Sequence, residues 1–151
     1  MNPGWLFVLA SLIAVVGITI SFRQLITRLE DKLRDSEEVN QKTFQKDLSR
    51  LFIKIMIIES IPIILIFLGF IEMNYFELTN LFQVYIPLIL VLGILVFGLI
   101  SIFSTRGAVI AMHEIPKDTR GFIYTLLFIG MALVSAIPII SIISIFMILG
   151  Q

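Results

Sequence analysis

The sequence predicts an all-α integral membrane protein with four transmembrane helices, and three observations support this. Of its 151 residues, 58% are hydrophobic and 15% are charged, whereas soluble domains average about 45–50% and about 25%. Four apolar stretches are each long enough to cross the roughly 30 Å hydrocarbon layer as a helix. The basic residues are concentrated in two of the connections between these stretches. Because so few polar groups cannot cover a soluble globule, we expect no water-soluble enzyme and no catalytic site.

The four predicted spans differ in length and in charge. Residues 5–22 form the first span and carry no ionisable group. Residues 51–71 form the second span, which contains Glu59 near its middle. The third and fourth spans, residues 81–103 and 121–149, are also uncharged. The fourth is longer than the hydrocarbon layer requires, so it must tilt or project beyond it.

Positive charges predict how these spans are oriented. Connections rich in Lys and Arg face the cytoplasm, and neither terminus nor residues 72–80 contain either residue type. We therefore expect both basic connections in the cytoplasm and both termini outside, in a bacterial plasma membrane. Eleven basic and eleven acidic residues cancel, which argues against nucleic acid as a partner. The basic residues of the two connections are Arg23, Arg28, Lys32, Arg34, Lys42, Lys46, Arg50, Arg106, Lys117 and Arg120.

The connection formed by residues 23–50 is predicted to be a helical hairpin that stands out of the membrane. Apolar residues recur at helical spacing through residues 25–33, so the first helix is expected to continue past its span. The chain then turns near residues 36–40 and returns as a helix through residues 44–48. Two interpretations are open for this charged stalk: a solvated helical hairpin, or a docking surface for a soluble partner.

An internal repeat relates the second span to the fourth at an offset of 76 residues. Residues 59–64 (ESIPII) align with residues 135–140 (SAIPII). Both place a proline inside a span, where it removes a backbone hydrogen bond and favours a kink. We therefore expect two fused helical hairpins of the same orientation, residues 1–76 and 77–151, related by an axis along the membrane normal.

Small residues and serines within the spans are candidates for contacts between helices. Small side chains let membrane helices approach closely, although such residues also occur without any special contact. A serine in a helix either bridges to a neighbouring helix or bonds to a carbonyl of its own turn, and both alternatives are open here. The candidates are Ala10, Ala14, Gly17, Gly93, Gly98, Ser141 and Ser144.

Glu59 is the strongest candidate for a functional residue. An ionised carboxylate at mid-membrane costs about 2.5–3.5 kcal/mol on insertion scales, and intramembrane acids commonly mark ion or proton paths. Lys54 lies about 140° away around the helix and is expected to extend to the cytoplasmic interface instead. Glu59 is then either an exchangeable ion carrier or a protonated group hydrogen-bonded between helices. The equivalent positions of the second hairpin are Ser135, which cannot ionise, and Pro138, and they form a degenerate site.

Residues 120–140, RGFIYTLLFIGMALVSAIPII, resemble the second helix of the c subunit of rotary ATP synthases. That family has an acid, a small residue, Leu or Ile, and Pro at this point, and residues 59–62 (ESIP) show the same pattern with the acid present. Residues 114–118 take the place of its short polar loop, and residues 104–108 resemble the end of its first helix. As a fused double hairpin the chain is similar to the proteolipids of V-type rotary ATPases, or to a divergent relative.

The resemblance implies a ring of such subunits that turns in the membrane, with stator and central-stalk subunits as partners and lipid around it. Glu59 matches the carrier carboxylate, and Ser60 resembles the serine that helps to hold the ion in sodium-binding members. Gln24 approximates the glutamine on their first helix, and Pro62 completes the motif. The cargo is then H⁺ or Na⁺, with no other metal and no cofactor.

A second function class is compatible with the same residues. A non-rotary membrane protein of this shape would act as an assembly factor or a small scaffold. It would then bind a soluble partner through the charged stalk at residues 23–50. Reversible ion binding at Glu59 distinguishes the two classes, because only the carrier requires it.

Overall fold

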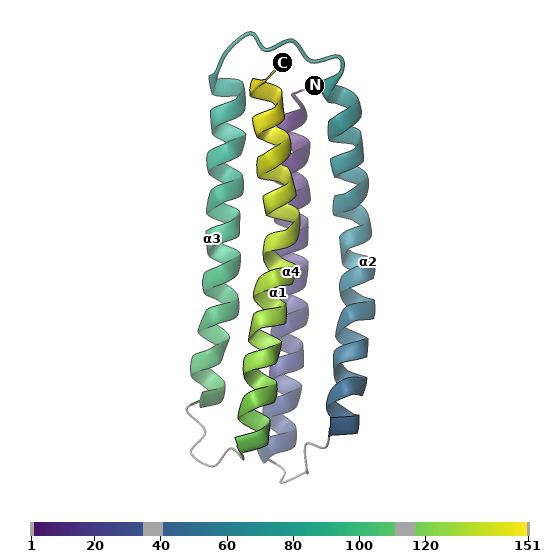
Figure 1. The fold of residues 1–151 in the computed structure, drawn as a ribbon, viewed down its shortest axis with the longest axis vertical. Coiled ribbons are helices and arrows are strands. Elements are labelled where there is room, and N and C mark those ends of the chain that lie inside the picture. The colour runs from purple at the N-terminus through teal and green to yellow at the C-terminus, as the bar shows by residue number, and fades with distance from the viewer. Residues whose placement is uncertain (1, 35–40, 111–116, 151) are drawn as a thin grey trace.

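The computed structural model describes residues 2–34, 41–110 and 117–150, which form four long α-helices (Figure 1). The described residues contain no β-strand. All four helices are long and apolar enough to cross a membrane. The prediction of an all-α chain with four such helices is therefore confirmed. The helices are α1, Pro3–Arg34; α2, Gln41–Met73; α3, Phe82–Ile110; and α4, Lys117–Leu149.

The helices α1 and α2 are much longer than the spans predicted for them. α1 continues past residue 22 to Arg34, and α2 begins at Gln41, so that it includes the predicted helical return through residues 44–48. At about 1.5 Å per residue, the 32 residues of α1 extend well beyond a hydrocarbon layer of roughly 30 Å. The predicted continuation of the first helix is thus confirmed. The predicted turn at residues 36–40 lies outside the described residues.

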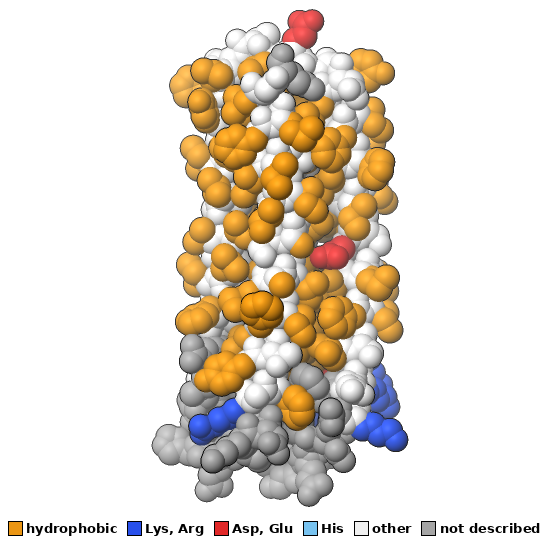
Figure 2. Space-filling model, in the orientation of Figure 1, with side chains coloured by type: hydrophobic (Ala, Val, Ile, Leu, Met, Phe, Trp, Pro, Cys, Tyr) orange, Lys and Arg blue, Asp and Glu red, His pale blue; other side chains and the backbone are white. Residues whose placement is uncertain are grey.

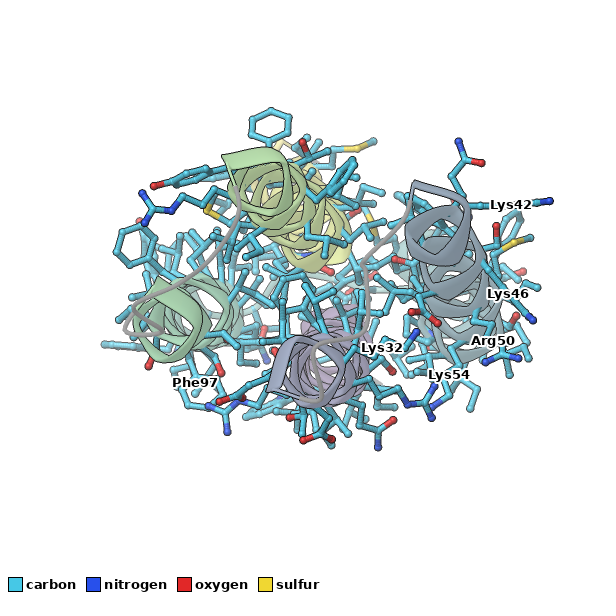
Figure 3. All side chains as sticks on the ribbon, turned by 90° about the horizontal axis from the view of Figure 1, so that it is seen from below. Lys32, Lys42, Lys46, Arg50, Lys54 and Phe97 are labelled. Carbon is cyan, nitrogen blue, oxygen red and sulfur yellow. The ribbon has the colours of Figure 1, made fainter. Side chains whose placement is uncertain are left out.

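The central helix of the bundle is α1. It packs along α2, α3 and α4, and α3 also packs along α4. α2 makes few contacts with α4, and the described residues of α2 make none with those of α3. Seen from below, α1 and α4 lie between α2 and α3 (Figure 3). Of the most apolar stretch of α1, 61% is buried inside the protein, against 22% for α2, so α2 is held almost entirely by α1.

The helices α2 and α4 correspond closely in their limits. Both contain 33 residues, and each boundary of α4 lies 76 residues after the matching boundary of α2. Each helix continues through its internal proline, Pro62 or Pro138, and both prolines are buried. These limits agree with the offset of the sequence repeat. Because α1 packs against all three other helices, the division into hairpins 1–76 and 77–151 stays a prediction.

Small residues allow close packing at the centre of the bundle. A Cβ atom added at Gly98 of α3 would lie 2.8 Å from Val15 Cγ1 and 3.0 Å from Val134 Cγ2. One glycine therefore lets side chains of α1 and α4 meet against α3. Gly93, on the same helix, has nothing within 4 Å of an added Cβ and belongs to the ordinary small residues. The predicted small residues that pack closely are Ala10, Ala14, Gly17 and Gly98.

A buried pair of serines joins α1 to α4. The Ser11 hydroxyl donates to the Phe7 carbonyl oxygen at 2.9 Å, and the Ser141 hydroxyl donates to the same oxygen at 3.2 Å. The two hydroxyl oxygens are 2.9 Å apart, and both serines are fully buried. Ser144 instead donates to the carbonyl of Ile140 in its own turn at 2.8 Å. Of the two open alternatives, Ser141 therefore bridges helices and Ser144 does not.

Replacing Ser141 with alanine is expected to lower the free energy of unfolding by about 0.6 kcal/mol, because one bond between helices in an apolar interior is lost. Ser144→Ala is the matched control on the same helix, and it should change stability less because its bond joins no second helix. Both values come from reversible unfolding of the full chain in mixed micelles. Equal losses in the two variants would contradict a bridging role for Ser141.

The surface between the two ends of the bundle is covered by hydrophobic side chains (Figure 2). Large exposed apolar residues occur on all four helices. In water an apolar surface of this extent would cause aggregation, whereas in a bilayer it faces the lipid tails. Basic side chains appear at the lower end, where α1 ends and α2 begins (Figures 1 and 2). The four spanning helices and this surface indicate a membrane protein.

Candidate functional site

Glu59 lies near the middle of α2, at the edge of the helix face that packs on α1. Ile55 and Pro62 on this face are buried, and Ile58 contacts Gly17 of α1 so closely that an added Cβ would collide with it. The Glu59 side chain is half-buried. Among the residues that the structure describes, none forms a hydrogen bond or ion pair with its carboxyl group. The Glu59 carboxyl group therefore lies at mid-height of the bundle, and no described side chain or backbone group bonds to it there.

Lys54 and Glu59 lie on opposite edges of this packed face. The two residues are separated by about 140° around the helix and by about 7.5 Å along it. Figure 3 shows Lys54 on the side of α2 that is turned away from α4. Glu59 is accordingly on the side nearest α4, beside the region where α2 and α4 make few contacts. The Lys54 ammonium group thus does not neutralise the Glu59 carboxyl group. This agrees with the prediction, from their spacing, that the two residues do not share a helix face.

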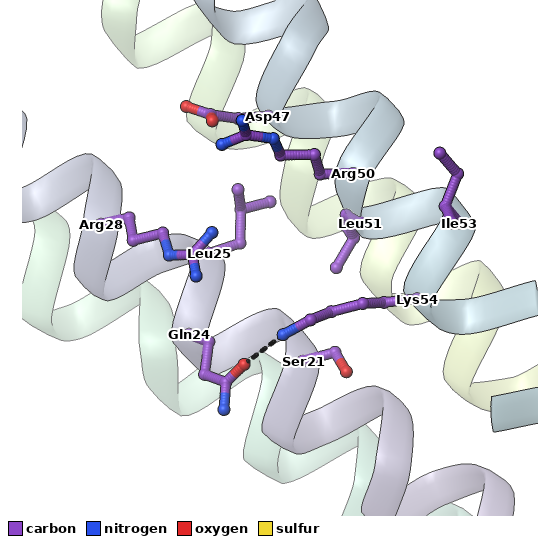
Figure 4. Close-up of a pocket in the computed structure, with 9 residues that line it drawn as sticks. All are labelled: Ser21, Gln24, Leu25, Arg28, Asp47, Arg50, Leu51, Ile53 and Lys54. Atoms are coloured by element: carbon purple, nitrogen blue, oxygen red, sulfur yellow. Dashed lines mark hydrogen bonds between the residues drawn. The ribbon is translucent and has the colours of Figure 1, made fainter. Parts of the chain in front are cut away.

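The structure does not bring Gln24 to Glu59. The contact between Gly17 and Ile58 places Glu59 near the level of Gly17, and Gln24 is seven residues further toward the lower end, about 10 Å along α1. Gln24 instead accepts a hydrogen bond from the Lys54 ammonium group at 2.8 Å, as Figure 4 shows. Its predicted place beside the ion therefore has no support in this arrangement.

Ser60 and Ser135 both direct their hydroxyl groups to their own helices. The Ser60 hydroxyl donates to the carbonyl oxygen of Met56 at 2.9 Å, and its side chain is exposed. Ser135 donates to the carbonyl oxygen of Met131 at 2.8 Å. Each hydroxyl oxygen keeps its lone pairs and could still accept a hydrogen bond or coordinate a cation. Neither hydroxyl group forms a hydrogen bond with the Glu59 carboxyl group. Coordination by Ser60, and a degenerate site at Ser135 with Pro138, stay predictions.

Two features of the described structure were missed by reasoning from the sequence. One is Ser11 of α1, which pairs with Ser141 of α4. These residues are 130 positions apart, so no spacing pattern in the sequence relates them. The other is a cleft between the lower ends of α1 and α2, which is lined by Arg28 and Arg50. A signal for the cleft was present, because the two arginines lie near the same end of their predicted helices.

The described residues hold no group of three or more His, Cys, Asp or Glu side chains that could bind a metal ion. A single carboxyl group can still bind a proton, or one cation together with backbone and hydroxyl oxygens. Reversible binding of one proton or one cation is a chemical step that Glu59 could support by itself. No protein-family model, no curated protein and no solved structure matches the chain.

Proposed function

We propose that the protein binds and releases a proton or a sodium ion at Glu59, as the ion-carrying subunit of a c-type membrane rotor ring. One observation carries this proposal: a half-buried carboxyl group in the middle of a spanning helix has no partner among the described residues. Ionised carboxylates in hydrocarbon are costly. A bound proton or cation removes that cost, and its exchange is the elementary step of a carrier.

The position of α2 supports exchange at Glu59. α2 is the least buried of the four helices. Glu59 lies at the edge of the face that packs on α1, and its side chain is only half-buried. An ion therefore need not cross the bundle to reach the carboxyl group. In a ring, the exposed apolar side of α2 would face lipid, a neighbouring copy or a stator subunit. We place the lower, basic end in the cytoplasm by the positive-inside rule. One carboxyl group per four helices lowers the number of ions moved per turn, which favours ATP-driven pumping.

Carbodiimide labelling tests the proposed ion binding. A hydrophobic carbodiimide partitions into the bilayer and reacts with protonated carboxyl groups, so we expect it to modify Glu59 of the full chain in lipid vesicles. Raising the pH should slow the reaction, and Na⁺ at constant pH should slow it further if Na⁺ is the cargo. Mass spectrometry of the α2 peptide measures the rate.

Matched variants make this test specific. Glu59→Gln should abolish the modification of that peptide, whereas Glu77→Gln, which alters an exposed acid in the connection after α2, should leave the rate unchanged. Glu59→Leu should not lower the free energy of unfolding, because no described hydrogen bond is lost; a loss of about 1–2 kcal/mol would indicate a structural acid instead. An inert Glu59, or a rate independent of both pH and Na⁺, would contradict ion exchange.

The oligomeric state tests the ring. Native mass spectrometry of the full chain in a neutral detergent should show a closed assembly of several copies. A monomer that still exchanges ions would refute the ring and keep the ion site. A monomer with an inert Glu59 would favour the assembly-factor or scaffold function, for which Lys42 and Lys46 on the outer side of α2 offer an exposed basic surface (Figure 3).

A further inference from the structure

A cleft of about 210 Å³ lies between the lower parts of α1 and α2 (Figure 4). Arg28 of α1 and Arg50 and Lys54 of α2 line it from both sides. Between these cations the wall of the cleft is apolar and includes Leu25 and Leu51, both of which are buried. Cationic groups around an apolar wall are suited to an amphiphile with a negative head, and less suited to a fully hydrated ion.

The cleft keeps a net positive charge. Asp47 is the one acidic residue that lines the cleft, and its carboxylate forms an ion pair with the Lys32 ammonium group at 2.7 Å. Because Lys32 does not line the cleft, the negative charge of Asp47 is balanced from outside. The guanidinium groups of Arg28 and Arg50 form no hydrogen bond or ion pair with any other residue in the described ranges. Two arginines are therefore available for a bidentate contact with an anionic oxygen pair such as that of a phosphate.

An apolar groove continues from this cleft toward mid-membrane. It lies between the same two helices and is lined by Gly17, Ile20 and Ile57, and it shares Lys54 and Gln24 with the cleft. Lys54 of α2 donates a hydrogen bond to Gln24 of α1 at 2.8 Å, where the cleft and the groove share these two residues (Figure 4). Ile20 and Ile57 are exposed along the groove. The cleft and the groove thus form one continuous site, with charge at its lower end and apolar side chains above.

We propose that this site binds one anionic phospholipid, with the phosphate between Arg28, Arg50 and Lys54 and one acyl chain along the groove. At the cleft the apolar parts of α1 and α2 give way to charged residues such as Arg28 and Arg50, so in a membrane we expect it at the depth of the lipid head groups. Basic pockets between spanning helices at the cytoplasmic side bind anionic head groups. The apolar groove selects a lipid over free phosphate, because only the lipid fills it. This inference is independent of Glu59 and of ion transport.

Lipid binding can be measured by native mass spectrometry of the full chain in a neutral detergent. Phosphatidylglycerol is expected to bind as one molecule per chain, about tenfold more tightly than phosphatidylcholine of the same acyl chains. The variant R28Q/R50Q should lose most of that preference, about tenfold or more. The matched control is K42Q/K46Q, which removes the same charge from exposed positions on α2 that do not line the cleft; its effect should stay below about twofold.

Three outcomes would overturn the proposal. Equal binding of the two lipids would remove the role of the cations, and equal losses in the two double variants would reduce the effect to general attraction at a basic surface. Displacement of phosphatidylglycerol by excess inorganic phosphate would show an anion site without a lipid groove. If R28Q/R50Q loses helicity by circular dichroism, the single variant Lys54→Gln takes its place, with an expected loss of about fivefold.

Discussion

Replacing Gly98 with valine is expected to destabilise the bundle by about 1–3 kcal/mol, because α1, α3 and α4 meet at this glycine. An added Cβ would lie 2.8 Å from Val15 Cγ1 and 3.0 Å from Val134 Cγ2. Both valines are fully buried, and a valine in a helix has one strongly preferred rotamer. Their methyl groups therefore cannot turn away, and the helices must separate. Reversible unfolding of the full chain in mixed micelles measures the loss.

Gly93→Val is the matched control for this experiment. It introduces the same β-branched residue into the same helix, but nothing lies within 4 Å of an added Cβ at Gly93. We expect a change of about 0.5 kcal/mol or less, the usual range for substitutions that touch nothing. A similar loss in both variants would assign the effect to helix propensity and would contradict the three-helix contact at Gly98.

Replacing Phe7 with alanine is expected to cost about 3 kcal/mol and to loosen α2 in particular. The Phe7 ring is fully buried. It packs edge-to-face against Phe70 of α2, with 5.8 Å between ring centroids, and an added Cβ at Gly69 would lie 2.7 Å from it. Because α2 is held almost entirely by α1, this ring is a principal attachment of its upper half. Hydrogen exchange should accelerate in residues 63–73 and remain unchanged in α3.

Leu9→Ala provides the control for Phe7→Ala. Leu9 belongs to the same helix, but its side chain is 47% exposed on the outer surface of the bundle. In a bilayer this side chain exchanges protein contacts for lipid contacts, so its truncation leaves no cavity and should cost about 0.5 kcal/mol or less. Uniformly faster exchange in all four helices of the Phe7 variant would contradict a specific attachment of α2.

The four helices could be predicted from the sequence because a spanning segment in lipid must satisfy its backbone groups within itself. Length and apolar content are then sufficient signals. The helix ends were predictable only in part. The sequence indicated that the first helix continues past its span and that the second begins before its span, but it did not indicate the ends at Arg34 and Gln41. Leu29 shows why α1 continues: it is buried against the bundle although its neighbours in sequence are charged.

The candidate site was predictable only in part. Glu59 could be identified because an acid in the middle of an apolar stretch is visible in the sequence alone. The surroundings of Glu59 could not, since they depend on the register between α1 and α2, which is set by the contact of Ile58 with Gly17. That register places Gln24 beside Lys54 and about 10 Å from the level of Glu59. If α1 were displaced by about two helical turns relative to α2, Gln24 would lie at the level of Glu59 instead.

The sequence by itself determined the four spanning helices, the concentration of basic residues in two connections, and the depth of Glu59 within its helix. Only the tertiary structure decided that α1 is the centre, that Ser141 pairs with Ser11, and that a basic cleft opens between α1 and α2. Hydropathy could not reveal the centre, because the most apolar stretch of α1 has the lowest mean hydropathy among those of the four helices, 2.4, and yet is the most buried. In a bilayer both the lipid and the interior are apolar, so hydropathy determines which segments enter the membrane, while the shapes of small and large side chains determine which helices meet.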